Sequence, residues 1–181
     1  MIIPSSLETE RLVIRTHIWD DLEPLILFFN NDEATSLLDL APGQKTAEGT
    51  QSLLDAIIKS YDTDEPIFAL AVVEKMTGQC IGSCGMAPDV ECSSDTQIYY
   101  AIFPEYQGNG YALEAISKII EYAFSDLKLE KVVARMAVEN HASIKVAEKA
   151  GMIPIRSMKN EKTRDSHKGC RYEMRNNKLS V

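Results

Sequence analysis

The sequence contains few cysteines, and their spacing excludes the common cysteine-based sites. The four thiols are Cys80, Cys84, Cys92 and Cys170, and no two of them form a Cys-x-x-Cys pair. That spacing is the usual mark of a zinc site or of a redox-active pair. We therefore expect reduced thiols that are mostly packed inside the protein, and no metal ion.

The sequence also lacks a long hydrophobic run and an excess of positive charge. Its longest apolar run, 67–73, is far shorter than the roughly 20 residues that span a bilayer. The first six residues, Met-Ile-Ile-Pro-Ser-Ser, contain neither a basic leader nor an apolar signal core. Nineteen basic residues against 27 acidic ones give a net charge of −8, which argues against a nucleic-acid or anionic-membrane surface. These absences favour a cytoplasmic protein.

No repeat, low-complexity tract or linker interrupts the chain. At 181 residues, of which 45% are hydrophobic, it lies near the length of one domain and can bury a sizeable core. We therefore expect a single domain over residues 1–181.

Hydrophobic periodicity and turn residues predict the order β-α-α-β-β-β-α-β-α-β-β, a mixed α/β fold. A short hairpin between two of the strands favours a mostly antiparallel sheet. Asp20 and Thr46 are expected to cap the first two helices, Gly151 is expected to end the last one, and residues 163–168 resemble an exposed turn. The expected strands are 9–15, 67–74, 79–86, 96–103, 131–137, 153–158 and 169–176, and the expected helices are 20–30, 47–61, 111–125 and 141–150.

The segment 98–112 is the most informative part of the chain. It runs from an apolar strand through Gly108 and Gly110 into a long amphipathic helix. Glycines there allow a positive φ and a close approach of a ligand, while the first N–H groups of the helix point back at the turn. A dinucleotide fingerprint fits poorly, because Leu113 stands where a third small residue is needed, and a Walker loop would need Gly-Lys-Ser/Thr. A turn that uses glycine only for its geometry stays open.

Three motifs from Gln107 to Gly151 resemble the acetyl-CoA-binding half of GNAT-superfamily N-acetyltransferases. Gln107-Gly108-Asn109-Gly110-Tyr111-Ala112 fits the Arg/Gln-x-x-Gly-x-Gly/Ala pattern of that superfamily. The second motif is Asn-x-x-Ser, from Asn140 to Ser143, and the third is Glu148-Lys149-Ala150-Gly151-Met152. The opening, residues 8–15, and the segment 103–108 resemble the branch of ribosomal-protein N-terminal alanine acetyltransferases. The resemblance spans nearly the whole chain.

The resemblance implies a GNAT-like fold and a site for acetyl-CoA without a metal ion. The backbone from Gly108 to Ala112 would hold the pyrophosphate at the positive end of the helix dipole. The pantetheine arm would lie where the strands 96–103 and 131–137 splay apart, and would pair with backbone near Ile102 and Phe103. The implied cofactor-binding residues are Ile102, Phe103, Gln107, Gly108, Asn109, Gly110, Tyr111, Ala112 and Asn140.

Several of these side chains have a simpler interpretation that the sequence leaves open. Asn140 is implied to bind pantetheine, yet an asparagine before a helix is also a favoured N-cap. Ser143 is implied to protonate the leaving CoA thiolate, or it only occupies the first turn of the helix. Related sequences often have Glu-Ile-Gly-Tyr where this chain has Gln97-Ile98-Tyr99-Tyr100. Gln97 cannot act as a base, and Tyr99 either replaces the lost group through its hydroxyl or only packs.

The missing carboxylate bears on the choice of acceptor amine. An α-amine with a pKa near 7.8 costs only about 1.1 kcal/mol to neutralise at pH 7, whereas a lysine near 10.4 costs about 4.6 kcal/mol. This difference favours a peptide N-terminus or a small amine of low pKa, acetylated directly in a ternary complex. The rivals are acetylation of a polyamine or an antibiotic, and a GNAT-like module that binds CoA or acyl-CoA without turnover. Apolar strand edges near the C-terminus suggest a homodimer.

Overall fold

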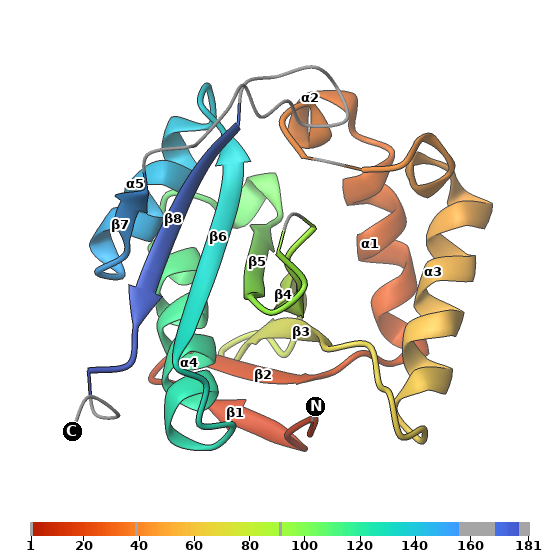
Figure 1. Ribbon diagram of the computed structural model, residues 1–181. Coiled ribbons are helices and arrows are strands. Elements are labelled where there is room, and N and C mark those ends of the chain that lie inside the picture. The colour runs from red at the N-terminus through yellow and green to blue at the C-terminus, as the bar shows by residue number, and fades with distance from the viewer. Residues whose placement is uncertain (1, 39, 91, 156–168, 178–181) are drawn as a thin grey trace.

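A single mixed sheet forms the centre of the computed structural model, which describes residues 2–38, 40–90, 92–155 and 169–177 (Figure 1). Its eight strands follow the order β1-β2-β3-β4-β5-β6-β8-β7. All neighbouring strands are antiparallel except β5 and β6, which are parallel. The strands are β1 (Ser6–Glu8), β2 (Leu12–Thr16), β3 (Ala69–Glu74), β4 (Cys80–Pro88), β5 (Thr96–Ile102), β6 (Lys131–Ala137), β7 (Ile153–Ile155) and β8 (Gly169–Arg175).

Helices lie on both faces of the sheet (Figure 1). On one face are α1 (Leu22–Phe29) and α3 (Ala47–Ser60), and on the other are α4 (Tyr111–Ser125) and α5 (His141–Lys149). Short helical segments connect them: η1 (Trp19–Asp21), α2 (Asp32–Thr35), η2 (Pro42–Lys45) and η3 (Pro104–Tyr106).

The two faces of the sheet bury two separate apolar clusters. The larger cluster lies under α4, whose residues Ala115, Ile116, Ile119 and Ala123 are fully buried, as their helical spacing predicts. The smaller cluster lies under α1 and α3 and includes Leu25, Phe28, Leu54, Ala71 and Phe103. The sheet is therefore fixed from both sides, and its strands can hold side chains at defined positions.

The predicted mixed α/β fold with a mostly antiparallel sheet is confirmed, and the order of elements differs only near the N-terminus. The expected strand 9–15 is wrong in extent, because Thr9 turns the chain: its hydroxyl accepts the N–H of Leu12 at 2.9 Å. That turn separates β1 from β2. The short α2 was not expected, since four residues are too few to show a helical period. The expected turn 163–168, and the last residues of the expected strand 153–158, lie outside the described residues.

The helix ends follow the predicted capping rules in most places. Thr46 caps α3, with its hydroxyl 3.0 Å from the N–H of Gly49, and Gly151 ends α5 with a φ of +90°. The expectation for Asp20 is wrong, because Asp21 stands at the N-cap of α1 and its carboxylate accepts the N–H of Ile18 instead. That carboxylate is used by a buried polar cluster described below.

The sheet opens between β5 and β6. Their register consists of one pair, Gln97 with Val133, whereas β4 and β5 are paired along the whole of β5. This pair lies at the start of β5, and among the described residues no further pair joins the two strands toward the end where β5 leads into the glycine turn. This opening lies between the two halves of the sheet and leads into the candidate site.

Candidate active site

The turn between β5 and α4 has the backbone that its glycines predict. Gly108 has a φ of +80° and Gly110, the N-cap of α4, has a φ of +83°. A Cβ on Gly108 would meet no atom within 4 Å, so this backbone faces open space. The N–H groups of the first turn of α4 are directed toward the same side, which is the arrangement that holds a phosphate group.

Arg11 braces this turn from the start of β2. Its guanidinium donates to the backbone oxygen of Asn109 at 2.9 Å and to Glu114 of α4 at 2.7 Å, and it lies 4.6 Å from the centre of the Tyr111 ring. The hydroxyl of Tyr111 donates to Glu74 of β3. These contacts tie the turn to two strands, so its amides have a fixed direction.

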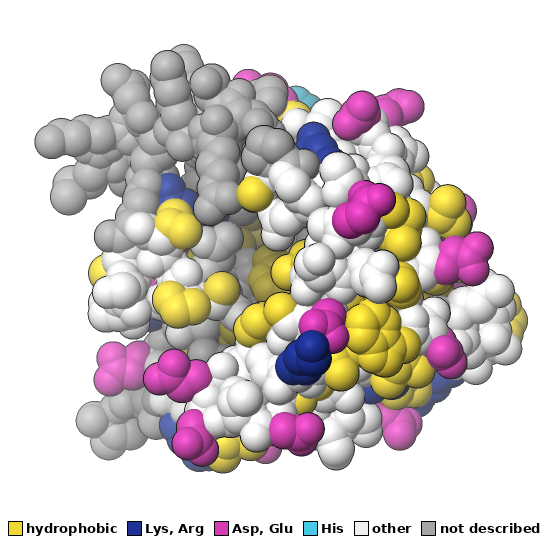
Figure 2. Space-filling view, turned by 90° about the vertical axis from the view of Figure 1, so that its right-hand side faces the viewer, with side chains coloured by type: hydrophobic (Ala, Val, Ile, Leu, Met, Phe, Trp, Pro, Cys, Tyr) yellow, Lys and Arg dark blue, Asp and Glu magenta, His cyan; other side chains and the backbone are white. Residues whose placement is uncertain are grey.

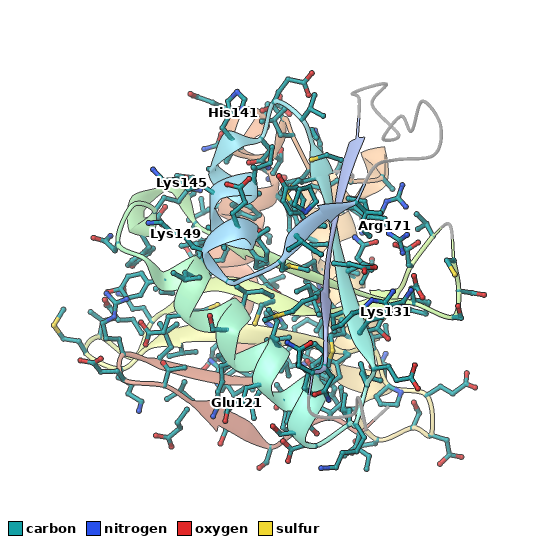
Figure 3. The ribbon with its side chains drawn as sticks, turned by 60° about the vertical axis from the view of Figure 1, so that its left-hand side comes forward. Glu121, Lys131, His141, Lys145, Lys149 and Arg171 are labelled. Carbon is teal, nitrogen blue, oxygen red and sulfur yellow. The ribbon has the colours of Figure 1, made fainter. Side chains whose placement is uncertain are left out.

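A cavity of about 760 Å³ extends from this turn along β5. Of the residues that the resemblance implies for the cofactor, Gln107, Gly108, Gly110, Tyr111 and Ala112 line this cavity. Asn109 does not line it: its amide donates to the carbonyl oxygens of Tyr106 and Gln107 and thereby supports the turn. The sequence analysis missed the two cations at this cavity, Lys145 and Lys149, which lie on the side of α5 next to the turn (Figure 3). The sequence signal that could have found them is their spacing of four residues, which places two side chains on the same side of a helix.

The edge of β5 at the opening presents backbone groups to this cavity. Phe103 donates its N–H to Ile81 of β4 at 2.9 Å, and the alternation of an antiparallel ladder then turns the polar groups of Tyr100 and Ile102 toward β6. The carbonyl oxygen of Ile102 accepts a hydrogen bond from Gln107 at 2.8 Å. Phe103 instead packs its ring against Phe28, with centroids 5.1 Å apart.

Across the opening, the start of α5 brings Asn140 and Ser143 to β5. The side-chain oxygen of Asn140 accepts the N–H of Ser143 at 3.1 Å, so Asn140 is an N-cap, and its amide nitrogen is left as the group to offer a ligand. The hydroxyl of Tyr100 donates to the backbone oxygen of Ser143 at 2.8 Å and joins β5 to α5. Burial raises the pKa of Tyr100, so its hydroxyl keeps its proton at neutral pH. Sequence analysis did not single out Tyr100, whose hydroxyl lies at the start of α5 beside Ser143.

A second cavity, of about 550 Å³, meets the first at Tyr100, Ala101, Asn140 and Ser143. It lies between the sheet and the helices α1 and α3. Figure 2 shows apolar side chains gathered around a hollow on this side of the molecule. Its apolar walls include Leu25, Phe28, Phe29, Leu38, Leu53, Leu54 and Ile57.

Tyr99 and Gln97 both line this second cavity, but Tyr99 is held by packing. It lies opposite Gly85 on β4, where an added Cβ would come within 2.6 Å of the Tyr99 hydroxyl. That hydroxyl is 3.5 Å from the carbonyl oxygen of Phe68, which is the limit of a hydrogen bond. Burial raises the pKa of Tyr99, so it does not supply a base at neutral pH.

A chain of polar groups that the sequence analysis missed also reaches the second cavity. His17 and Ser83 both line it, with the Nε2 atom of His17 3.1 Å from the Ser83 hydroxyl. The Nδ1 atom of His17 is 3.1 Å from Asp21, which Arg15 binds through two hydrogen bonds of 2.8 Å. The spacing of four between His17 and Asp21 was the only sequence signal.

The two thiols on β4 are packed and remain protonated at neutral pH. Cys80 and Cys84 are buried and unbridged, and burial raises the pKa of both; that of Cys80 rises to about 12. Among the described residues, no three His, Cys, Asp or Glu side chains are grouped as metal ligands. In the same part of the chain, no helix has the length and apolar character needed to cross a membrane.

Comparisons with known proteins agree with this geometry. Residues 11–153 match the family described as acetyltransferase (GNAT) domain. The chain is 31% identical over 145 residues to the uncharacterized N-acetyltransferase YoaA of Bacillus subtilis, covering 80% of this chain and 81% of that protein.

Two solved structures share the fold. One is a spermidine N-acetyltransferase from Vibrio cholerae in complex with CoA and spermine, with a TM-score of 0.75 and 21% identity over 93% of this chain and 97% of that one. The other is a ribosomal-protein-S5-alanine acetyltransferase from Vibrio fischeri, with a TM-score of 0.75 and 18% identity over 98% of this chain and 100% of that one.

The chain belongs to the GNAT acetyltransferase family. It is an acyltransferase, and its acetyl donor is acetyl-CoA. The residues present suit that donor, because the open glycine turn at a helix N-terminus and the two nearby lysines match a pyrophosphate.

Proposed function

We propose that the protein transfers the acetyl group of acetyl-CoA directly to a primary amine carried on an apolar body, with the α-amine of a peptide as the first candidate. The observation that supports this proposal is the meeting of two cavities at Ala101 and Ser143, in the opening between β5 and β6. A thioester bound along β5 and an amine bound under α1 and α3 would approach each other there.

On the donor side, acetyl-CoA would lie along the glycine turn and the edge of β5 that faces the opening. The pyrophosphate would lie on the amides after Gly108, next to Lys145 and Lys149, and the pantetheine arm would follow β5 at Tyr100 and Ile102. One N–H at the thioester carbonyl would act as an oxyanion donor, a role whose loss costs about 2.7–4 kcal/mol in other enzymes. Ser143 or Tyr100 would return a proton to the CoA thiolate.

Direct transfer suits the chemistry of the thiols. A covalent acetyl-cysteine intermediate needs a thiolate near neutral pH. Burial raises the pKa of Cys80 to about 12, and Cys84 is also raised. We therefore expect a ternary complex of enzyme, acetyl-CoA and amine.

The acceptor side favours an apolar amine over a polyamine. Most of the described residues that line the second cavity are apolar and none of them is Asp or Glu, so the walls stabilise apolar groups and leave a second ammonium unpaired. A polyamine is the other candidate, because one relative, 36% identical over 61 residues, is a spermidine N(1)-acetyltransferase from Vibrio cholerae.

The homodimer and the cytoplasmic location also stay predictions.

Release of CoA thiol from acetyl-CoA tests the proposal. The panel contains peptides with apolar or charged first residues, an N-terminally blocked lysine peptide, spermidine and an aminoglycoside. We expect the highest kcat/KM with a free α-amine next to an apolar side chain. A preference for spermidine would show that the acceptor is a polyamine and not the apolar amine that we propose. If the wild type binds CoA tightly and only Gln97→Glu or Tyr99→Gly turns over, the wild-type protein is a binding module.

A further inference from the structure

A buried chain of three polar side chains ends at the acceptor side of the site. It runs from Asp21 through His17 to Ser83. His17 and Ser83 line the second cavity, under α1 and α3, which is the acceptor cavity of the proposed function. His17 and Asp21 are only 3% and 1% exposed. Buried polar groups of this kind need complete hydrogen bonding, and this chain has it.

The position of Ser83 places the chain next to the point where the cavities meet. Ser83 on β4 pairs directly with Ala101 on β5, so the two side chains lie on the same face of the sheet. Adjacent strands are about 4.8 Å apart. Because Ala101 lines both cavities, the Ser83 hydroxyl lies within about one strand spacing of the path on which the amine meets the thioester.

The hydrogen bonds around His17 can form when its imidazole is neutral and also when it is charged. Asp21 is an acceptor, so Nδ1 of His17 carries a hydrogen in both states. When His17 is neutral, its Nε2 atom accepts the hydrogen of Ser83. When His17 is charged, Nε2 donates to Ser83, whose hydrogen turns to the carbonyl oxygen of Leu70, 3.1 Å away. Taking up a proton therefore requires only a rotation of one hydroxyl.

Asp21 is the charged group next to the Nδ1 atom of His17. Burial raises the pKa of Asp21, but hydrogen bonds from Arg15, His17 and the backbone of Ile18 outweigh it, and the pKa is lowered well below its usual range. Apart from the charged Arg15, the other groups that face the cluster are neutral. Burial raises the pKa of Tyr61 and of Cys80, each to about 12, and it also raises the pKa of Tyr99, whose hydroxyl is hydrogen-bonded to Ser83. Asp21 is thus the one negative charge against His17 among the described residues, and Arg15 fixes its position.

From this arrangement we infer that Ser83 and His17 form a relay that takes the proton from the acceptor amine. This inference rests on the proposed function. The neutral amine attacks the thioester carbon, the C–N bond forms, and the C–S bond breaks with its electron pair leaving on the CoA sulfur. The nitrogen loses one proton to Ser83, which passes its own to Nε2 of His17, and the thiolate gains one proton from Ser143, Tyr100 or water. The relay takes the place of the carboxylate that Gln97 does not supply.

The test is the pH profile of kcat/KM for the best amine in the wild type, Ser83→Ala and His17→Gln. Removal of a proton acceptor lowers the rate by about 10²–10⁴-fold. We expect a loss of at least about 10²-fold near neutral pH in both variants, with unchanged affinity for acetyl-CoA. The loss should shrink at high pH and with amines of lower pKa, because such amines need less help from a base.

Ser83→Ala keeps the experiment decisive if His17→Gln folds poorly, since it leaves the His17–Asp21 pair in place. His141→Gln removes an exposed histidine as a comparison. A loss that is the same at every pH and for every amine would show a structural role and overturn the relay, as would a larger loss in His141→Gln. If Ser83→Ala and His17→Gln both keep the activity and the pH profile of the wild type, the relay is wrong and the proposed function stands. If the wild type acetylates no amine, the proposed function is wrong as well.

Discussion

Gly108 permits a comparison between backbone strain and ligand binding. Gly108 and Gly78 have φ values of +80° and +71°, and an added Cβ would meet no atom within 4 Å at either position. Alanine in this conformation costs about 1–2 kcal/mol, so Gly108→Ala and Gly78→Ala should lose similar stability in thermal unfolding. Gly108→Ala should weaken binding of acetyl-CoA by about tenfold or more, because Gly108 lines the cavity along β5 that is proposed for acetyl-CoA. Gly78 does not line that cavity, so Gly78→Ala should bind acetyl-CoA normally. Equal affinities in a calorimetric titration would contradict the assigned phosphate site.

Tyr99 is expected to act through its ring and not through its hydroxyl. The hydroxyl is 3.5 Å from the carbonyl oxygen of Phe68, which is the limit of a hydrogen bond, and the ring covers Gly85. Tyr99→Phe should therefore keep kcat/KM close to that of the wild type, far from the roughly 100-fold loss that follows removal of a proton-transferring group. Tyr99→Ala, which also removes the ring, should lower stability and serves as the contrasting variant. A 100-fold loss in Tyr99→Phe with normal folding would restore Tyr99 as a chemical group of the site.

The beginning of α5 combines a helix cap with a predicted ligand contact, and two substitutions separate them. Aspartate is as good an N-cap as asparagine, but it lacks the amide donor. Asn140→Asp should keep the melting temperature and lose affinity for acetyl-CoA. Asn140→Ala should lose both, with about 0.5–2 kcal/mol of stability from the missing bond to the N–H of Ser143. If Asn140→Asp binds acetyl-CoA normally, Asn140 is only a cap.

The elements that could be read from the sequence are those with a long, unbroken pattern. The helix 111–125 and the strand 131–137 have the expected bounds, because their buried residues repeat without interruption. The N-terminal strand was read as one element, since nothing in its apolar pattern reveals that Thr9 bonds to Leu12 and turns the chain. Asp20 and Asp21 are equivalent as sequence signals, and only the position of Arg15 decides between them.

The two sides of the candidate site differ in how well the sequence predicts them. The donor side is largely local: the glycine turn and the helix after it are consecutive, so their spacing is enough to predict their geometry. The acceptor side joins His17 to Ser83, 66 residues apart, through strand pairing that no short motif encodes. Tyr100 and Ser143 meet in the same way across 43 residues. Residues of this second kind become visible only when the register of the sheet is known.

Carboxylates tie distant parts of the fold together, and this makes the stability of the protein sensitive to acid. Asp21 binds Arg15, Glu114 binds Arg11, and Asp95 binds Arg171. Burial raises the pKa of each of the three carboxylates, but hydrogen bonds from these and other partners outweigh it, so each pKa is lowered from a usual value of 3.8 for Asp or 4.5 for Glu. A lowered pKa in the folded state gives stability that is present above the unfolded value and lost as the pH falls.

We therefore expect the free energy of unfolding in urea to be constant near neutral pH and to fall as the pH drops below about 5. Asp21→Asn should lower stability near neutral pH, and its difference from the wild type should narrow in acid, because the wild-type carboxylate then becomes protonated too. Asp20→Asn, at the exposed neighbouring carboxylate, should follow the wild type at every pH. A constant gap between Asp21→Asn and the wild type down to about pH 3 would show that Asp21 contributes through packing and not through its charge.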